Sequence, residues 1–241
     1  MIYVYAITAG APSPATLESA RGIDDAALDA RGPRSVSAVY SAVEMSPRPS
    51  RESAVRHERV VERLMAKRTV LPARFGTVLR DAAALDEVLA TNHERLVQGL
   101  ERVDGCVELG VRVLWDAEGE RVEEPAELPA GGGPGRAYLA ARAAEERQRR
   151  RVEARAGELA ANLNNLLRPG ARDGVVRVPP DPRFVMAGAY LVAREKVAEF
   201  RHAVEDAARV FETLRLLCTG PWPPYHFVPE LSPPAAEVRH A

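Results

Sequence analysis

The sequence places one histidine and two glutamates, His57, Glu58 and Glu62, where a hydrolytic metal site is worth testing. A zinc-peptidase helix needs a second histidine four residues after the first, because that spacing puts both imidazoles on one helix face. Position 61 is valine, so the zinc motif is absent. We interpret His57 as a histidine on the apolar face of a helix, with both glutamates in solvent. The other four histidines are scattered, without the cysteine or acidic spacing typical of a metal cluster.

A glycine-rich run at 131–135 resembles a phosphate-binding loop only in composition. A P-loop places Lys-Ser or Lys-Thr at the start of a helix whose amide groups hold the phosphate. Arg136 and Ala137 follow here, and no strand leads directly into the run. We interpret it as a flexible linker. The sequence also lacks an arrangement of Ser-His-Asp, Cys-His or paired carboxylates. We therefore predict no enzymatic activity, catalytic residue, metal or cofactor.

The most basic stretch, residues 147–155, contains five arginines and one glutamate. RNA binding is one interpretation, because RNA-recognition domains share the element order expected for this half of the chain. Those domains read bases with aromatic residues in a motif that the corresponding strand here, FVMAGAYLV at 184–192, does not match. Two glutamates just before the basic stretch can each pair with an arginine four residues later. A solvated, ion-paired helix face is therefore the preferred interpretation.

The composition is that of an ordinary globular protein, with 46% hydrophobic and 28% charged residues in 241. This length favours two domains of about 100–130 residues. A net charge of −1 gives no overall attraction to nucleic acid or anionic lipid. No apolar run is long enough to cross a membrane, and the N-terminal MIYVYAI lacks the features of a signal peptide. We expect a soluble, cytoplasmic monomer that binds neither nucleic acid nor membrane.

Hydrophobic periodicity divides the first half of the chain into strands and helices. In chain order these are a strand at 2–7, a strand at 34–43, a helix at 52–67, an irregular extended segment at 69–79 and a helix at 81–103. Pro72 and Gly76 interrupt the extended segment. Asp81 suits the N-cap of the last helix, and Gly105 follows its end. We predict an N-terminal α+β domain at 1–104 and assign it no specific topology.

The same patterns predict the elements of the second half. In chain order they are a strand at 106–115, a loop at 117–135, a helix at 138–167, strands at 175–178 and 184–192, a helix at 196–210 and a strand at 211–218. This β-α-β-β-α-β order is that of the ferredoxin-like fold. The predicted fold class is α+β with two domains. The C-terminal domain, residues 105–228, is ferredoxin-like with a long helix and a Pro/aromatic C-terminal tail, and residues 229–241 form a tail expected to be mobile.

Two cysteines, Cys106 and Cys218, are too few for a disulfide framework or a thiolate metal site. In a ferredoxin-like sheet the first and last strands are antiparallel neighbours, so the start of one lies beside the end of the other. We predict that these two side chains lie close together. We expect free thiols, because the cytosol is reducing.

The stretch TGPWPPYHFV at 219–228 contains three prolines and three aromatic residues. Proline fixes φ and donates no hydrogen bond, so Pro221, Pro223 and Pro224 exclude a helix and a central strand. The aromatic residues carry large apolar areas that a rigid segment can lay across a neighbouring surface. We predict an extended clamp that packs on its own domain or on a partner.

Four stretches together resemble the GvpL/GvpF family of gas vesicle proteins. They are YVYAI at 3–7, VLPARFGTVL at 70–79, GRAYLAAR at 135–142 and TGPWPPYHFV at 219–228, and they span nearly the whole chain. The resemblance implies two α+β domains, the second a modified ferredoxin fold. It also implies a non-enzymatic accessory or minor structural protein, located at the gas vesicle, that contacts the hydrophobic shell protein and other accessory proteins. The family brings no catalytic or metal-binding residues, and the branch, GvpL or GvpF, is left open.

A shell subunit that builds a hydrophobic wall carries apolar, strand-forming surface that aggregates if left free. A soluble partner can cover it with aromatic anchors or by adding a strand to an exposed edge. Our candidate partner-contact residues lie in two segments and are Pro72, Arg74, Phe75, Gly76, Trp222, Pro223, Pro224 and Tyr225. The alternative is that Trp222 and Tyr225 seal one domain against the other. A ferredoxin-like RNA-binding or small-ligand regulatory module stays open as the alternative function.

Overall fold

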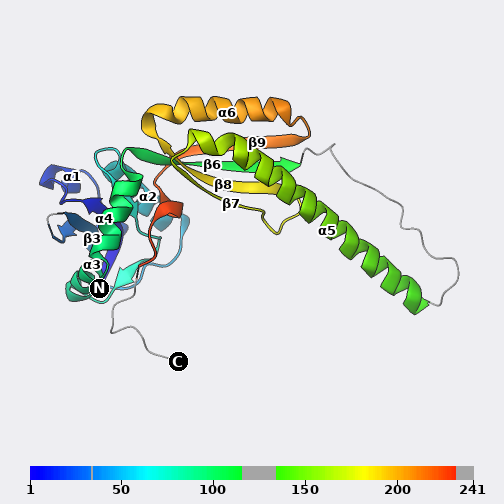
Figure 1. Ribbon diagram of the computed structural model, residues 1–241. Helices are drawn as coiled ribbons and strands as arrows, with labels where there is room; N and C mark the ends of the chain where they lie inside the picture. The colour runs from blue at the N-terminus through cyan, green and yellow to red at the C-terminus, as the bar shows by residue number, and fades with distance from the viewer. Residues whose placement is uncertain (34, 116–133, 232–241) are drawn as a thin grey trace. The chain divides into compact units, whose positions relative to one another are not determined.

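The computed structural model describes residues 1–33, 35–115 and 134–231 (Figure 1). The chain forms two compact units, one of residues 1–108 joined by the segment that begins at Pro221, and one of residues 109–220. The expected division placed residues 221–228 with the C-terminal domain, whereas the compact units place them with the N-terminal one. The predicted loop at 117–135 lies largely outside the described residues, as does most of the predicted tail.

The first unit is built on an antiparallel sheet whose central strand is β1 (Ile2–Ala9). Its order is β2-β3-β1-β4, with β5 also pairing β1. The other strands are β2 (Leu28–Arg31), β3 (Val36–Ala42), β4 (Val70–Pro72) and β5 (Val78–Leu79). Strand β2 was not predicted, because LDAR offers little β-branched or aromatic signal and depends on pairing with β3.

The extended segment at 69–79 is broken as its proline and glycine predicted, and both of its pieces, β4 and β5, pair with β1. The chain thus leaves the sheet after β4 and returns to it at β5. The loop between the two strands, residues 73–77, is held at both ends by the same strand, which limits how far it can move.

Helices α1 (Pro14–Glu18), α2 (Arg51–Met65), α3 (Ala82–Thr91) and α4 (His93–Val103) complete the first unit. Helix α2 begins at the Ser50 cap and buries His57, Val60, Val61 and Leu64 at the predicted spacing. The single helix predicted at 81–103 is wrong. Asn92, buried and at φ −108° and ψ 11°, separates α3 from α4, and its side-chain amide donates to the Val88 carbonyl at 2.9 Å.

The second unit contains a sheet of order β7-β8-β6-β9. Its strands are β6 (Cys106–Trp115), β7 (Asp173–Arg177), β8 (Phe184–Ala193) and β9 (Leu214–Trp222). Helices α5 (Pro134–Leu167) and α6 (Val197–Val210) contact each other and both contact β8, so they lie on one face of the sheet (Figure 1). The core between them includes Leu109, Leu163, Tyr190 and Phe200.

Strand β9 runs four residues beyond its predicted end and includes Pro221. A proline is tolerated there because β9 is the last strand in the sheet order. The Thr219 hydroxyl lies 3.4 Å from the Gly110 carbonyl, so Cys218 is level with the middle of β6. The predicted register, with Cys218 beside Cys106 at the start of β6, is therefore wrong, and neither of these two cysteines is in a disulfide.

Candidate partner-binding site

The segment that carries Arg74, Phe75 and Gly76 forms a tight turn. The Thr77 amide donates to the Arg74 carbonyl at 3.1 Å, and Gly76, the third residue of the turn, has φ +87°. A type II turn requires a positive φ at this position, which glycine adopts without steric cost. The turn leaves Arg74 and Gly76 exposed and directs Phe75 back toward the sheet.

Tyr3 and His57 hold this turn from beneath. The Gly76 amide donates to the Tyr3 hydroxyl at 3.0 Å, and that hydroxyl lies 3.0 Å from His57 Nδ1. On the other side of the ring, His57 Nε2 lies 3.1 Å from the Ala73 carbonyl, which only accepts. The assignment that satisfies every group has Tyr3 donating to Nδ1 and a neutral His57 donating from Nε2.

Burial sets the charge state of both side chains. His57 is 2% exposed, and loss of hydration lowers its pKa to about 4, so the ring is neutral near pH 7. Burial likewise raises the pKa of Tyr3 to about 12. The Phe75 ring packs edge-on against both, with centroids 6.2 Å from Tyr3 and 5.9 Å from His57. The predicted position of His57 on the apolar face of the helix is confirmed. The sequence did not predict its contacts with Tyr3 and Ala73.

Residues 223–230, here called the C-terminal strap, run over the same region of the first unit. Its short helix η4 (Tyr225–Phe227) contacts β4, so the two segments singled out in the sequence meet. The Tyr225 hydroxyl donates to Glu58 on α2 at 2.9 Å. Burial raises the pKa of Glu58, which lies beside His57 and is only partly exposed. The sequence predicted an extended clamp here. The strap instead makes a helical turn at η4.

A buried carboxylate fixes the next residue of the strap. Glu108 is 5% exposed and accepts from the His226 amide at 2.9 Å and from His226 Nδ1 at 2.7 Å. A polar group that is removed from water needs such partners. The Phe227 ring is buried beneath Arg102, whose guanidinium carbon lies 5.7 Å from the ring centroid.

The last part of the strap lies against α4. A Cβ added at Gly99 would lie 3.0 Å from a Pro229 ring carbon, so the glycine permits close approach of the strap. Arg95 on the same helix donates to the Glu230 carbonyl at 3.5 Å. The strap is thus attached to α2, β6 and α4 by contacts that the sequence alone did not predict.

The candidate partner-contact residues divide into three groups. Those buried inside the unit are Pro72, Pro223 and Pro224, and those partly covered are Phe75 and Tyr225. Arg74, Gly76 and Trp222 are exposed, with Trp222 at 42%. Sequence reasoning missed Glu58 and Glu108, the acceptors of the strap. Glu58 was assigned to solvent, because the amphipathic pattern of α2 does not reveal a partner 167 residues away.

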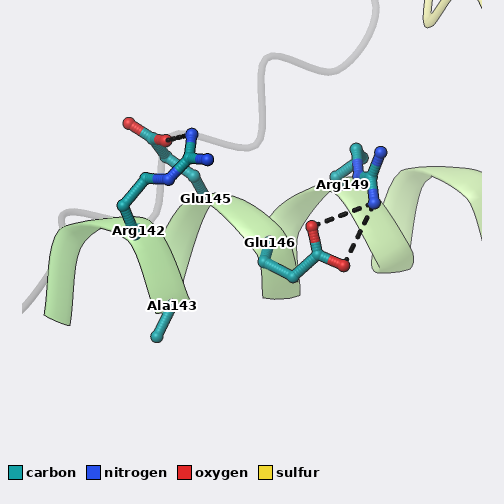
Figure 2. Close-up of a pocket in the computed structure, with 5 residues that line it drawn as sticks. All are labelled: Arg142, Ala143, Glu145, Glu146 and Arg149. Atoms are coloured by element: carbon teal, nitrogen blue, oxygen red, sulfur yellow. Dashed lines mark hydrogen bonds and ion pairs between the residues drawn. The ribbon is translucent and has the colours of Figure 1, made fainter. Parts of the chain in front are cut away.

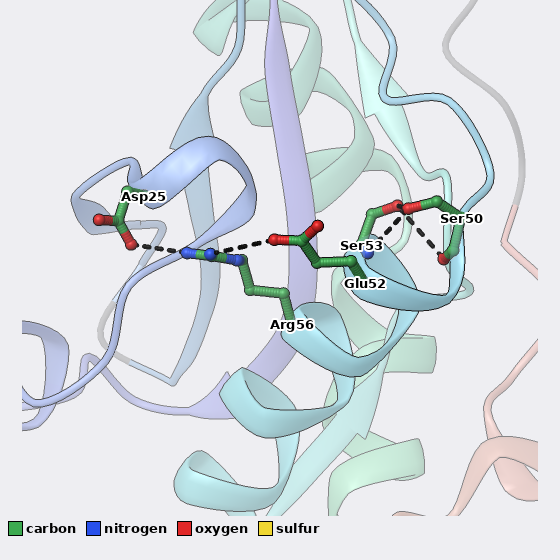
Figure 3. A network of polar contacts seen from close by, with 5 residues as sticks. All are labelled: Asp25, Ser50, Glu52, Ser53 and Arg56. Carbon is green, nitrogen blue, oxygen red and sulfur yellow. Dashed lines mark hydrogen bonds and ion pairs between the residues drawn. The ribbon is translucent and has the colours of Figure 1, made fainter.

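A hollow in the first unit lies beside α2 and has a volume of about 460 Å³. Figure 3 shows its polar contacts: Arg56 bonds Asp25 at 2.6 Å and lies 3.6 Å from Glu52, while Ser50 caps the helix through the Ser53 amide. Asp25 has a positive φ of 63°, which is unusual for a residue with a side chain. These charges satisfy one another, and we assign the network to anchoring α2.

Among the described residues, no three His, Cys, Asp or Glu side chains gather as metal ligands would. None of the helices in the described ranges combines the length and apolar character needed to cross a membrane.

Comparison with known proteins places this architecture among gas vesicle proteins. The family described as "Gas vesicle synthesis protein GvpL/GvpF" matches residues 1–229. The chain is 36% identical over 185 residues to gas vesicle protein L of Streptomyces sp. (strain CB03234), covering 73% of this chain and 68% of that protein. It is 30% identical over 240 residues to gas vesicle protein F of the same strain, covering 94% and 98%.

The fold agrees with a solved structure. The crystal structure of the gas vesicle protein GvpF from Anabaena sp. PCC7120 superposes with a TM-score of 0.74 at 21% identity, covering 95% of this chain and 96% of that one. The chain belongs to the GvpL/GvpF family and is involved in gas vesicle formation. The resemblance inferred from its motifs is thereby confirmed.

Proposed function

We propose that this chain is a non-enzymatic accessory or minor structural protein that binds the hydrophobic shell protein and assists gas vesicle assembly. The observation that carries the proposal is Trp222, which is 42% exposed although the two prolines after it are buried. Burying an exposed tryptophan on a partner supplies a large apolar area and a polar N–H. The proposed location is the gas vesicle, in contact with the shell protein and other accessory proteins.

Preorganisation of the strap supports this role. Tyr225, His226 and Phe227 are each held by a partner in the first unit, so the residues after Trp222 need no ordering when a partner binds. A segment already fixed in its bound shape avoids about 0.5–1.5 kcal/mol of ordering cost per immobilised side chain. We propose Trp222 as the anchor, with Arg74 and Gly76 on the nearby turn as secondary contacts.

The second unit offers a second surface for the proposed partner, the edge strand β9. Its strand order β7-β8-β6-β9 follows the ferredoxin-like arrangement, and we propose that fold for it. Strand β9 is last in the order, and the exposed Leu217 lies on it. An edge strand of this kind can accept an added strand from a partner. Pro221 lacks an N–H, so addition would be confined to the residues before it.

Co-expression with the principal shell protein from the same gene neighbourhood tests the proposal. A tagged chain should keep the shell protein soluble and co-purify with it at a fixed ratio. The Trp222→Ala variant should lose most of the captured shell protein while remaining folded. Val210→Ala, which truncates a 72% exposed side chain on α6, is the matched control and should capture as much as the native chain.

Two other results of this experiment would contradict the proposal. If Trp222→Ala lowers the melting temperature by several degrees or abolishes folding, without a separate binding defect, Trp222 has a structural sealing role instead. If the native chain purifies alone while the shell protein stays in inclusion bodies, direct binding is wrong.

A further inference from the structure

Helix α5 is longer than the sheet that it covers. Its 34 residues span about 51 Å at 1.5 Å per residue, whereas the longest strands, of ten residues, span about 33 Å. Figure 1 shows its N-terminal part extending past the end of the sheet in its own unit. The buried residues of α5 begin only at Ala156 and continue with Ala160, Leu163 and Leu167. None of the described side chains of α5 before Ala156 is buried.

We call residues 138–155 the helical arm. A helix of this length is marginally stable in water unless tertiary packing covers one of its faces. Ion pairs within the arm give some support: Glu146 lies 3.0 Å from Arg149, and Arg142 lies 3.8 Å from Glu145 (Figure 2). These pairs are exposed, and exposed pairs add little to stability. A partner helix against one face of the arm would supply the packing that its own unit does not.

One face of the arm carries alternating charges. At about 100° per residue, four charged side chains fall within about 60° of the helix circumference. In chain order they are Arg142, Glu146, Arg149 and Glu153, here called the charged stripe, which has no net charge. Tyr138 and Leu139 are 66% and 67% exposed and border the stripe on its two sides, at the N-terminal end of the arm.

The order of charges in the stripe is reversed about its midpoint. Arg142 and Glu153 are equally far from the point between residues 147 and 148, and so are Glu146 and Arg149. A second copy of the same helix, placed antiparallel and centred on this point, therefore brings an arginine opposite each glutamate. In a parallel pair each side chain would face its own counterpart, and like charges would meet. Facing charges of this kind set the orientation of paired helices.

We propose that two copies of this chain associate through their helical arms, which pair antiparallel with the charged stripes facing each other. The twofold axis lies level with the point between residues 147 and 148. Because a twofold interface is self-complementary, each contact is made twice. The pair thus contains two Arg142–Glu153 contacts and two Glu146–Arg149 contacts between the copies.

The apolar ends of the arm fit the same register. Tyr138 and Leu139 come level with Ala156 and Gly157 of the second copy, where small residues leave room for large ones. A Cβ added at Gly157 would meet no atom within 4 Å, so the space beside this residue is open. Each end of the pair therefore places a large exposed apolar side chain against the start of the packed part of α5.

The excess positive charge of the arm does not oppose this pairing. Arg147, Arg151 and Arg155 follow one another at four-residue spacing and lie on the face opposite the charged stripe. In the antiparallel pair these two rows point away from each other, and about 0.1 M salt screens exposed charges beyond about 10 Å. A partner of uniform charge, such as nucleic acid or an acidic peptide, would meet as much repulsion as attraction on the stripe.

The proposal is independent of shell-protein binding, because it concerns the second unit and needs no other protein. It departs from the monomer expected from the sequence, and the mass of the chain in solution decides between them. The contact covers one face of a helix about 30 Å long, which is small among protein interfaces. We therefore expect a weak dimer, with a Kd of about 10–100 μM.

Sedimentation equilibrium of the full chain tests the proposal. Over about 5–500 μM protein, a range that brackets this Kd, the average mass should rise from that of one chain toward that of two. Arg142→Glu should weaken dimerisation at least about tenfold, because two glutamates then face Glu153 of the opposite copy. Glu153→Arg should weaken it equally, since two arginines then face Arg142. Circular dichroism checks that both variants keep the native helix content.

Mixing the two variants gives the sharpest result. A heterodimer of the Arg142→Glu chain with the Glu153→Arg chain pairs opposite charges at both contacts, so an equal mixture should regain native dimerisation although neither variant dimerises well alone. Leu139→Ser should weaken dimerisation of the native chain. Arg147→Glu is the matched control: it reverses an exposed charge on the opposite face and should change the Kd by less than a factor of about two.

Several results would overturn the proposal. A native chain that stays monomeric over the whole concentration range does not pair through its arm. Variants that dimerise as tightly as the native chain would place the interface elsewhere, and a mixture that fails to regain dimerisation would exclude the antiparallel register. An equal loss in Arg147→Glu would show a general charge effect. If the chain stays monomeric and the shell protein protects the arm from hydrogen exchange, the occupant is another protein.

Discussion

The Tyr225 hydroxyl donates a hydrogen bond to Glu58 at 2.9 Å, joining the C-terminal strap to α2 across 167 residues of sequence. Glu58 directly follows His57, which together with Tyr3 holds the turn that carries Phe75. One helix therefore supports both segments of the candidate partner-binding site. The exposed Trp222 and the exposed Arg74 belong to these two segments.

Tyr225→Phe should lower the free energy of unfolding by about 1–2 kcal/mol, because a partly buried carboxylate loses its donor. Urea denaturation followed by circular dichroism measures the change. Tyr40→Phe is the matched control: its hydroxyl also donates to a carboxylate, Asp29, at 3.0 Å, but in an exposed position, and the expected loss is below about 0.5 kcal/mol. Equal losses for the two variants would show that the strap bond has no special role.

Stability should fall in mild acid because of His57. Its folded-state pKa is lowered to about 4, whereas an unfolded chain binds the proton near pH 6.5. Between these values the unfolded state holds more protons, so the free energy of unfolding decreases as pH falls from about 6.5 to about 4. The contribution of His57 approaches a slope of about 1.4 kcal/mol per pH unit within this window.

Urea denaturation at a series of pH values measures that slope. His57→Gln removes the titrating ring, so the slope between pH 6 and pH 4.5 should become smaller. It should also lower stability at pH 7, since the Tyr3 and Ala73 contacts change. His202→Gln, at an exposed position on α6, should keep the native slope. A His57→Gln variant with the native slope would exclude His57 as the acid-sensitive group.

Two glycine replacements should act in opposite directions. Gly76→Ala should destabilise by about 1 kcal/mol, because an L-residue is strained at φ +87° even though its Cβ would meet no atom within 4 Å. Gly157→Ala also meets nothing within 4 Å but lies inside α5, where alanine is favoured by about 0.8–1 kcal/mol. Chemical denaturation gives both values. A stabilising Gly76→Ala would contradict the type II turn.

Phe227→Ala should destabilise by about 3–5 kcal/mol, because it removes a fully buried ring and leaves a cavity beneath Arg102. Trp222→Ala, only five residues earlier, should change stability by less than about 1 kcal/mol, since its side chain is 42% exposed. Thermal unfolding of the two purified variants measures the difference. The reverse order would mean that Trp222, and not Phe227, fixes the strap.

Local pattern was sufficient for many of the elements. Strand β6 was predicted to the residue, because apolar and polar residues alternate along it with period two. Helix α2 and its buried face followed from four apolar or aromatic positions at 3.6 spacing. Elements without a strong pattern were missed: β2 has few strand-forming residues, and the break at Asn92 lies within a continuous helical pattern.

The candidate site was predicted as two separate segments, and only the fold brought them together. Their motifs also carried the family resemblance, because local sequence preserves turn and proline signatures. The sequence did not indicate that Tyr225 reaches Glu58 or that His226 reaches Glu108. It likewise could not separate the buried prolines of the strap from the exposed Trp222, since all three are plausible surface or core residues.

The sequence by itself determined most of the element types, the β-α-β-β-α-β order of the second half and the family, because these depend on spacing along the chain. Tertiary structure alone decided the pairing of Tyr225 with Glu58, the register of β9 against β6 and the burial of each aromatic residue. These depend on which surfaces meet after the chain has folded. Periodicity tells which face of an element is apolar, but not which distant element will cover it.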